Sequence, residues 1–320
     1  MSPSSLHLGI DENGLGPRLG PLVVTAVAAR TTAKGAQVVS GRARGVLAER
    51  IGDSKKLVSF SDSVLGEAWA RLLSPTPPAG EDTPDGLIRA LSIDGRADLE
   101  RPCPEDHKSQ CWATDGESYA SEEPLRRRLM RDLDGLRKKG VDVLGARTVV
   151  VCTQRLNEAA SRGITRFQSD LFAMERLILH MHERYGCEVH ATCGKVGGYN
   201  RYPAAFGPLA GRLFTTLEEG RARSEYQLAA LGRVAFVRDA DADHLLVSLA
   251  SLVGKWVRDH LTRRVTRYHR AHDPSLPEVS GYHDPVTTRF IAASALARRT
   301  RGVLDACFER RAVSVEGLDR

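Results

Sequence analysis

The chain has 320 residues, enough for one large domain or two smaller ones, with a formal net charge of +6 and 42% hydrophobic residues. No stretch approaches the roughly 20 consecutive apolar residues of a membrane-spanning helix, and residues 1–6 lack the layout of a signal peptide, so we expect a cytoplasmic protein. The six cysteines have no dense, regular spacing, which excludes a disulfide-rich secreted scaffold.

Arginine dominates the basic residues, since only eight of the 46 are lysine. Its planar guanidinium suits contacts with phosphate and nucleic acid. An arginine-biased genome would give the same composition, so this feature leaves both explanations open.

The first two predicted elements are neighbouring strands. Residues 6–11 are mostly apolar, and residues 21–30 form a second apolar run rich in β-branched side chains. A Gly- and Pro-rich turn separates the two runs. So short a connection predicts an antiparallel pair.

Further along the chain, strands alternate with helices. The predicted strands are residues 147–152, 187–193 and 232–239, and the predicted helices are residues 166–186 and 244–264. An antiparallel pair followed by this alternation predicts an α/β fold, with a mixed β-sheet flanked by helices. We expect Trp256 in the core.

Two regions interrupt the pattern. Residues 75–145 join a Pro- and Gly-rich loop to a basic helical segment at 126–139, and we interpret them as an insertion in a domain spanning residues 1–265. The basic segment would either bind nucleic acid or form a solvated face. Residues 266–320 predict a C-terminal helical extension, with a helix that has Pro285 in its first turn.

Carboxylates cluster where two of the predicted strands end. Asp11 and Glu12 lie at the end of the first strand, and Asp239, Asp241 and Asp243 lie at the end of the strand that begins at residue 232. If these strands are neighbours, the carboxylates converge at one edge of the sheet, where a hard divalent cation would relieve their repulsion. Alternatively, the second group only caps the helix that follows it.

Five segments also resemble motifs of the type-2 ribonucleases H (the ribonuclease HII family), in that family's order. These are "GIDENGLGPRLGPLVV" at 9–24, "DSKKL" at 53–57, the strand, "LN" and "AM"-bearing helix at 149–177, "DADADHLLVSLASLVGKWVRD" at 239–259, and "SGYHDPVTTRFI" at 280–291. Each motif alone is weak evidence, but five in order form a specific pattern.

This resemblance implies a ribonuclease H-like mixed sheet with a helical C-terminal extension. It also implies an endonuclease that hydrolyses RNA in RNA–DNA hybrids, or at ribonucleotides embedded in DNA, with Mg²⁺ or Mn²⁺ and two-metal chemistry. The expected partner is therefore nucleic acid, with no membrane association, and we expect a monomer.

The same resemblance assigns roles to individual residues. Asp11 would bridge both ions, and Glu12 and Asp241 would be terminal ligands, which makes these three the candidate catalytic and metal-binding residues. The backbone at Gly14 and Gly16 would approach the 2′-hydroxyl that distinguishes RNA from DNA. The full set of residues implied to contact substrate is Gly14, Leu15, Gly16, Ser54, Lys55, Ser248, Ser251, Lys255, Arg258 and Tyr282.

The sequence departs from the family pattern at one metal-binding aspartate. Cys193 stands at that position, and a thiol is a poor ligand for Mg²⁺. Along the predicted strand the same face carries no carboxylate, so only Asp239 or Asp243 would compensate. Leu15 also replaces an arginine of the glycine motif. These departures favour an alternative, a catalytically inactive ribonuclease H-like protein that binds nucleic acid or a partner.

Two other groups of metal-ligating residues have alternative explanations. Cys103, His107 and Cys111 have the spacing of part of a zinc site, but no fourth ligand is evident in the sequence. Cys187 and Cys193 flank His190 on a predicted strand, where the histidine would point to the opposite face.

Overall fold

The computed structural model describes residues 5–76, 80–101, 103, 110–197 and 199–311. In this part of the chain, seven strands form one mixed sheet in the order β3-β2-β1-β4-β7-β6-β5. The strands are β1 (Ser5–Asn13), β2 (Leu22–Thr31), β3 (Val141–Val151), β4 (Val189–Gly194), β5 (Phe214–Glu219), β6 (Arg223–Leu228) and β7 (Gly232–Val237). The predicted antiparallel pairing of the first two strands is confirmed, because Ser5 to Asn13 pair in register with Thr31 to Val23.

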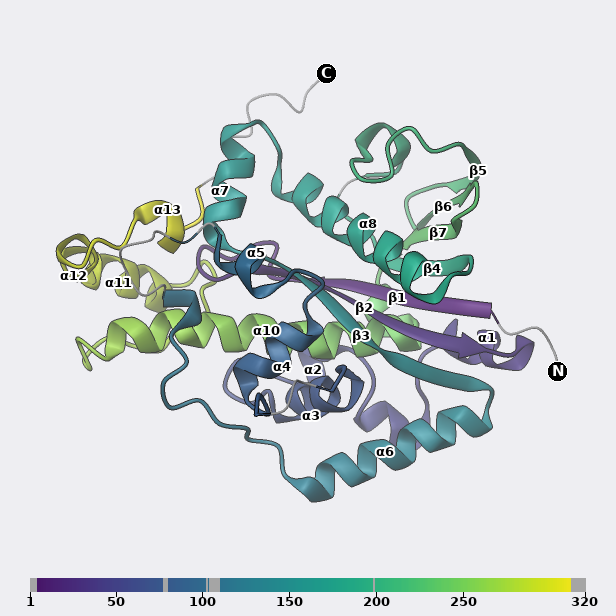
Figure 1. The fold of residues 1–320 in the computed structure, drawn as a ribbon, viewed down its shortest axis with the longest axis horizontal. Coiled ribbons are helices and arrows are strands. Elements are labelled where there is room, and N and C mark those ends of the chain that lie inside the picture. Colours follow the sequence, from purple (N-terminus) through teal and green to yellow (C-terminus); the bar gives the residue numbers. More distant parts are fainter. Residues whose placement is uncertain (1–4, 77–79, 102, 104–109, 198, 312–320) are drawn as a thin grey trace.

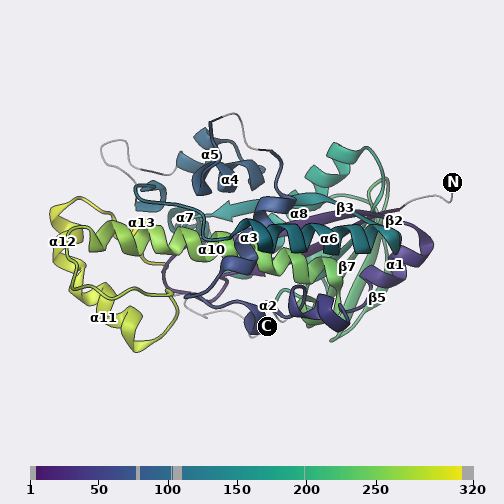
Figure 2. The ribbon, with the colours of Figure 1, turned by 90° about the horizontal axis from the view of Figure 1, so that it is seen from below.

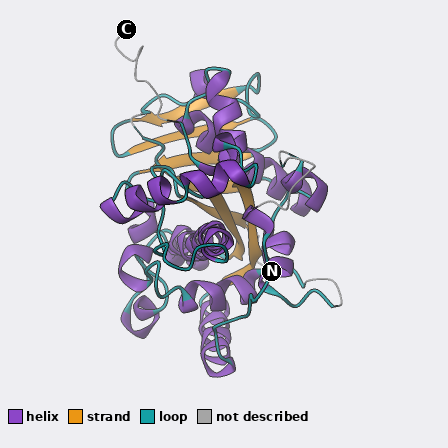
Figure 3. Cartoon of the chain, turned by 90° about the vertical axis from the view of Figure 1, so that its left-hand side faces the viewer, coloured by secondary structure: helices purple, strands orange, loops and turns teal. Residues whose placement is uncertain are grey.

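The helices lie around this sheet (Figures 1 and 3). They are α1 (Ala33–Val39), α2 (Ser54–Leu57), α3 (Val64–Leu73), α4 (Pro84–Leu91), α5 (Arg96–Glu100), α6 (Glu123–Lys138), α7 (Thr153–Ser161), α8 (Arg166–Tyr185), α9 (Ala240–Asp243), α10 (Leu245–Arg270), α11 (Pro285–Ala293), α12 (Ala295–Thr300) and α13 (Asp305–Phe308). The predicted mixed sheet flanked by helices is therefore confirmed. No helix among the described residues is long and apolar enough to span a membrane.

Two hydrophobic layers cover the two faces of the sheet. On one face, α8 packs through Leu171, Met174 and Leu177 in a cluster that includes Leu8 and Ile10 of β1. On the other face, α10 and α3 pack against the opposite side chains of β2. Figures 1 and 2 show α8 and α10 on opposite sides of the strands. Trp256 of α10 lies in the second layer and is buried, as predicted.

Gly9 allows α10 to approach the sheet closely. A Cβ atom at this position would lie 2.2 Å from the backbone carbonyl carbon of Leu246, which no real side chain tolerates. Because β-strand side chains alternate, Gly9 faces α10 while its neighbours Leu8 and Ile10 face α8. This contact brings the start of α10 against the end of β1.

The region predicted as an insertion contains α4, α5 and α6 and is tied to α10 by buried charges. The guanidinium of Arg264 is fully buried and pairs with Glu117 at 2.6 Å and with Asp85 at 3.0 Å. The hairpin of β5 and β6 was not predicted from the sequence. All six residues of β5 are exposed, so the strand lacks the alternation that marks a half-buried strand.

Candidate active site

A pocket of about 450 Å³ opens where β1, β4 and β7 end and α10 begins. β1 and β7 are not direct neighbours, because β4 lies between them. All three strands are parallel, however, so their carboxyl ends still meet at one edge of the sheet. The two acidic groups predicted from the sequence therefore contribute to the same pocket.

Most of the predicted site residues line this pocket. They are Asp11, Glu12, Gly14, Leu15, Gly16, Ser54, Lys55, Asp241, Ser251, Lys255, Arg258 and Tyr282. Ser248 is not among the lining residues, since its buried hydroxyl donates a hydrogen bond of 2.8 Å to the backbone carbonyl of Asp241. That bond fixes the start of α10 instead.

Asp11 is buried and Glu12 is partly buried, and their carboxylates repel each other. Burial, followed by the charge of Glu12, raises the pKa of Asp11 well above its usual value, while a hydrogen bond with Ser251 opposes the shift. Burial, followed by the charge of Asp170, raises the pKa of Glu12 to about 8. Both side chains would hold their negative charge at neutral pH far more readily with a cation nearby.

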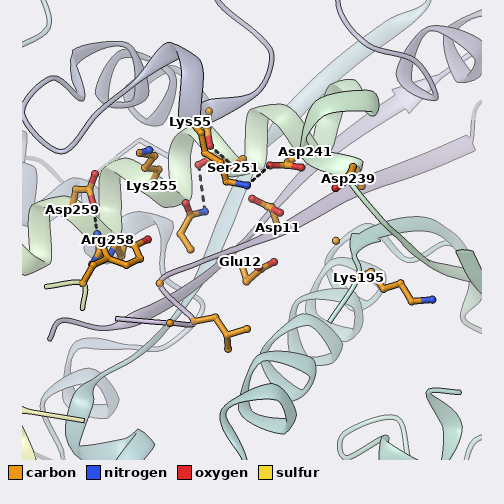
Figure 4. A pocket seen from close by; sticks show the side chains of 18 of the residues that line it. Asp11, Glu12, Lys55, Lys195, Asp239, Asp241, Ser251, Lys255, Arg258 and Asp259 are labelled. Carbon is orange, nitrogen blue, oxygen red and sulfur yellow. Dashed lines mark hydrogen bonds and ion pairs between the residues drawn. The ribbon is translucent and has the colours of Figure 1, made fainter. Parts of the chain in front are cut away.

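The ammonium of Lys55 lies among these carboxylates (Figure 4). Its Nζ is 3.5 Å from Oδ2 of Asp241, and the charge of Asp241 raises the pKa of Lys55. The same ammonium lowers the pKa values of Asp11 and Glu12, although their net shifts are upward. Lys55 thus occupies part of the space where a bound cation would be stabilised.

The end of β4 leaves open space between the two carboxylates of β1. A Cβ atom on Gly194 would lie 3.1 Å from Oδ1 of Asp11 and 3.3 Å from Oε2 of Glu12. The preceding residue, Cys193, is fully buried in the layer that α8 covers. Burial, and then the charge of Asp170, raises the pKa of its thiol.

The two aspartates proposed as compensating ligands have different surroundings. Asp239 lines the pocket and is paired at 3.5 Å with Arg238. Its φ of 56° lies in the left-handed region, which is uncommon for a residue other than glycine. Asp243 does not line the pocket and pairs with Arg42 at 3.1 Å on the exposed surface.

At the other end of the pocket, Arg258 is held by several partners. Its guanidinium donates to Oδ1 of Asp259 at 2.7 Å and to the carbonyl of Ser280 at 2.5 Å. The same group lies over the ring of Tyr282, 4.7 Å from the ring centroid. Tyr282 itself is 47% exposed, so its ring is available to a ligand.

Three buried residues near the pocket were missed by the sequence analysis. Asp170 lies on α8, Asp259 lies on α10, and Arg310 donates to the backbone carbonyls of Gly14 and Gly20 in the glycine-rich turn. Asp170 had a signal in the sequence, because it shares the helical face of Ala173, Met174 and Leu177 that packs on the sheet. Arg310 had none, because it is remote from that turn in the sequence.

The other candidate metal ligands are arranged differently. His107 lies outside the described residues, so the combination with Cys103 and Cys111 is not described. His190 stacks on His7 with ring centroids 5.0 Å apart, and Cys187 is exposed whereas Cys193 is buried. Across the described ranges, no three His, Cys, Asp or Glu side chains are placed so that they could hold a metal ion as they stand.

No family model matches the chain, and no curated protein matches it. It is similar to solved structures of ribonucleases HII and HIII. Ribonuclease HII from Archaeoglobus fulgidus, solved in complex with PCNA, is 17% identical with a TM-score of 0.42, covering 98% of both chains. Bst ribonuclease HIII in complex with Mn²⁺ is 13% identical with a TM-score of 0.45, covering 98% of this chain and 68% of that one. Ribonuclease H2 from Pyrococcus horikoshii OT3 is 14% identical with a TM-score of 0.37, covering 95% of this chain and 92% of that one.

Proposed function

We propose that this protein is a metal-dependent endonuclease that hydrolyses RNA in RNA–DNA hybrids or at ribonucleotides embedded in duplex DNA. The observation that supports the proposal most directly is the meeting of Asp11, Glu12 and Asp241 in one pocket with the glycine-rich turn. Carboxylates gathered away from water repel one another, and among the described residues Lys55 is the one lysine that the pocket places against Asp241, so a divalent cation would offset the repulsion that remains.

The residues present fit a hard divalent cation. Carboxylate oxygens are the donors that Mg²⁺ and Mn²⁺ prefer, and the space above Gly194 lies between one oxygen of Asp11 and one of Glu12. Since no three such side chains of the described residues already converge on a point, binding requires the carboxylates to rotate and Lys55 to leave Asp241. When bound, divalent ions would activate a water molecule and stabilise the leaving oxygen.

The chain's own residues would position the nucleic acid. The backbone at Gly14 and Gly16 lines the pocket without side-chain bulk, so it can approach a 2′-hydroxyl. Lys255 lines the same pocket and would contact a phosphate. The half-exposed ring of Tyr282 would stack on a sugar or base, held in place by the guanidinium of Arg258.

Cleavage of two defined substrates tests this proposal. We expect the purified full-length chain to cut an RNA–DNA hybrid, or a DNA duplex carrying one ribonucleotide, in Mg²⁺ or Mn²⁺ and not in EDTA. Asp11→Asn should abolish cleavage. Asp243→Asn is the matched control, because Asp243 belongs to the same acidic run but pairs with Arg42 outside the pocket, and it should retain the native rate.

The alternative function is nucleic-acid binding without cleavage, which the thiol at Cys193 favours. In that case the native protein binds the hybrid but cuts no faster than Asp11→Asn, and cleavage appears only in Cys193→Asp. Cleavage by the native chain that is lost in Asp11→Asn excludes this alternative.

A further inference from the structure

Asp170 is a fully buried carboxyl group, and neither of its oxygen atoms has a hydrogen-bond partner among the described residues. It is the fifth residue of α8, on the helical face that packs against the sheet. Glu175, on the same helix, provides a contrast. Its Oε2 accepts hydrogen bonds from the backbone N–H groups of Gly207 and Leu209, at 3.0 and 2.8 Å. Glu175 therefore fixes a loop through hydrogen bonds, whereas Asp170 accepts no hydrogen bond from the described residues.

Asp170 does not line the pocket itself but lies behind it, on the helix that packs against the face of β4 to which Cys193 points. Its charge acts on Glu12 and on the thiol of Cys193, and the charge of Asp11 acts on Asp170. Glu12 and Cys193 belong to β1 and β4, the adjacent parallel strands at whose ends the pocket opens. Asp170 thus lies beside the position where the sequence lacks an expected carboxylate, on the side of the sheet to which Cys193 points.

A buried carboxyl without partners destabilises a fold whether or not it is ionised. The neutral form leaves a hydroxyl donor unpaired, and the ionised form leaves a charge unpaired, so each loses free energy relative to water. Among the described residues, no side chain or backbone group donates a hydrogen bond to either oxygen of Asp170 to offset that loss. A cation shared with Glu12 would satisfy both groups at once.

We propose that Asp170 is the carboxylate that completes the metal site, presented by α8 in place of the one missing from β4 at Cys193. The fourth carboxylate would then come from α8 and not from β4, where the thiol of Cys193 stands. Together with Asp11, Glu12 and Asp241, the site would keep four carboxylates. This inference rests on the proposed function for the identity of the ion, but it concerns which residues bind it.

Direct binding of Mn²⁺ to the full-length protein tests the assignment without relying on activity. The titration follows free Mn²⁺ by electron paramagnetic resonance for the native chain, Asp170→Asn, Cys193→Asp, the double variant Asp170→Asn/Cys193→Asp, and Glu175→Gln. Glu175→Gln is the control for removing a buried acid from the same helix. If Asp170→Asn does not fold, as judged by circular dichroism, Asp170→Ser replaces it.

We expect Asp170→Asn to weaken Mn²⁺ binding by about tenfold or more, as losses within a metal site commonly do. The double variant should recover most of the native affinity, because it moves the carboxylate back to β4, and Glu175→Gln should bind as the native protein does. Native-like Mn²⁺ affinity in Asp170→Asn overturns the inference, as does a native chain that binds no Mn²⁺.

Parallel cleavage assays separate this inference from the proposed function. If Mn²⁺ binding requires Asp170 but the native chain cuts neither substrate, the inference stands and the nuclease proposal fails. If the native chain and Asp170→Asn both cut and both bind Mn²⁺ equally, the nuclease proposal stands and the inference fails.

Discussion

Arg310 holds the glycine-rich turn of the pocket in shape. Its buried guanidinium donates hydrogen bonds to the carbonyl of Gly14 at 2.5 Å, of Leu15 at 3.3 Å, and of Gly20 at 2.7 and 2.9 Å. Burial, followed by repulsion from Arg166, lowers the pKa of Arg310 to about 9, so the group remains a cation at neutral pH. We predict that Arg310→Met destabilises the protein and loosens the turn.

The size of the effect follows from the acceptors that would lose their partner. The carbonyls of Gly14 and Gly20 belong to buried residues, and leaving one buried acceptor unpaired costs about 1–3 kcal/mol. Gly20 retains a long hydrogen bond of 3.4 Å from Thr153, and removal of the buried charge of Arg310 offsets part of the loss. We therefore expect the free energy of unfolding to fall by about 3 kcal/mol.

Urea denaturation at pH 7 measures this change, with Arg311→Met as the matched control. Arg311 is the next residue and is exposed, so its replacement should alter the free energy of unfolding by less than about 0.5 kcal/mol. If Arg310→Met is as stable as Arg311→Met, the buried hydrogen bonds do not stabilise the turn and the reasoning is refuted.

Three further changes test other parts of the structure. Glu117→Gln should lower the free energy of unfolding, measured by urea denaturation, by about 3–5 kcal/mol, because it removes a charged partner of buried Arg264. Although burial raises the pKa of Glu117, hydrogen bonds from His260 and Arg264 lower it to about 2. The native protein should therefore lose stability as the pH falls from about 4.5 towards 2, and a melting temperature that is flat over this range would contradict the pairing. Gly194→Ala should weaken Mn²⁺ binding about tenfold, because its Cβ fills the space between the carboxylates, and unchanged affinity in a Mn²⁺ titration would argue against an ion there. Tyr282→Ala should weaken hybrid binding about tenfold by fluorescence anisotropy without altering the melting temperature, and unchanged affinity would remove the stacking role.

The sequence was sufficient for features that depend on short stretches of chain. Two apolar runs and the Gly- and Pro-rich turn between them identify the β1–β2 pair, and the 3.6-residue period identifies α8 and α10. The positions of Asp11 and Glu12 at the end of β1 follow from the same pattern, since a strand's carboxyl end is where such sites form. These features are local, so no knowledge of the packing was needed.

Only the tertiary structure decided which distant groups meet at that strand end. In the folded chain β4 lies between β1 and β7, and Asp243 pairs with Arg42 on the surface. The packing of α8 on the sheet places Asp170 where its charge acts on Glu12. These contacts join residues far apart in the chain, and hydrophobic burial of whole helix faces determines them rather than any local propensity. For this reason the sequence was enough to locate Asp11 and Glu12, whereas the groups that surround them are determined by the packing of β4, α8 and α10.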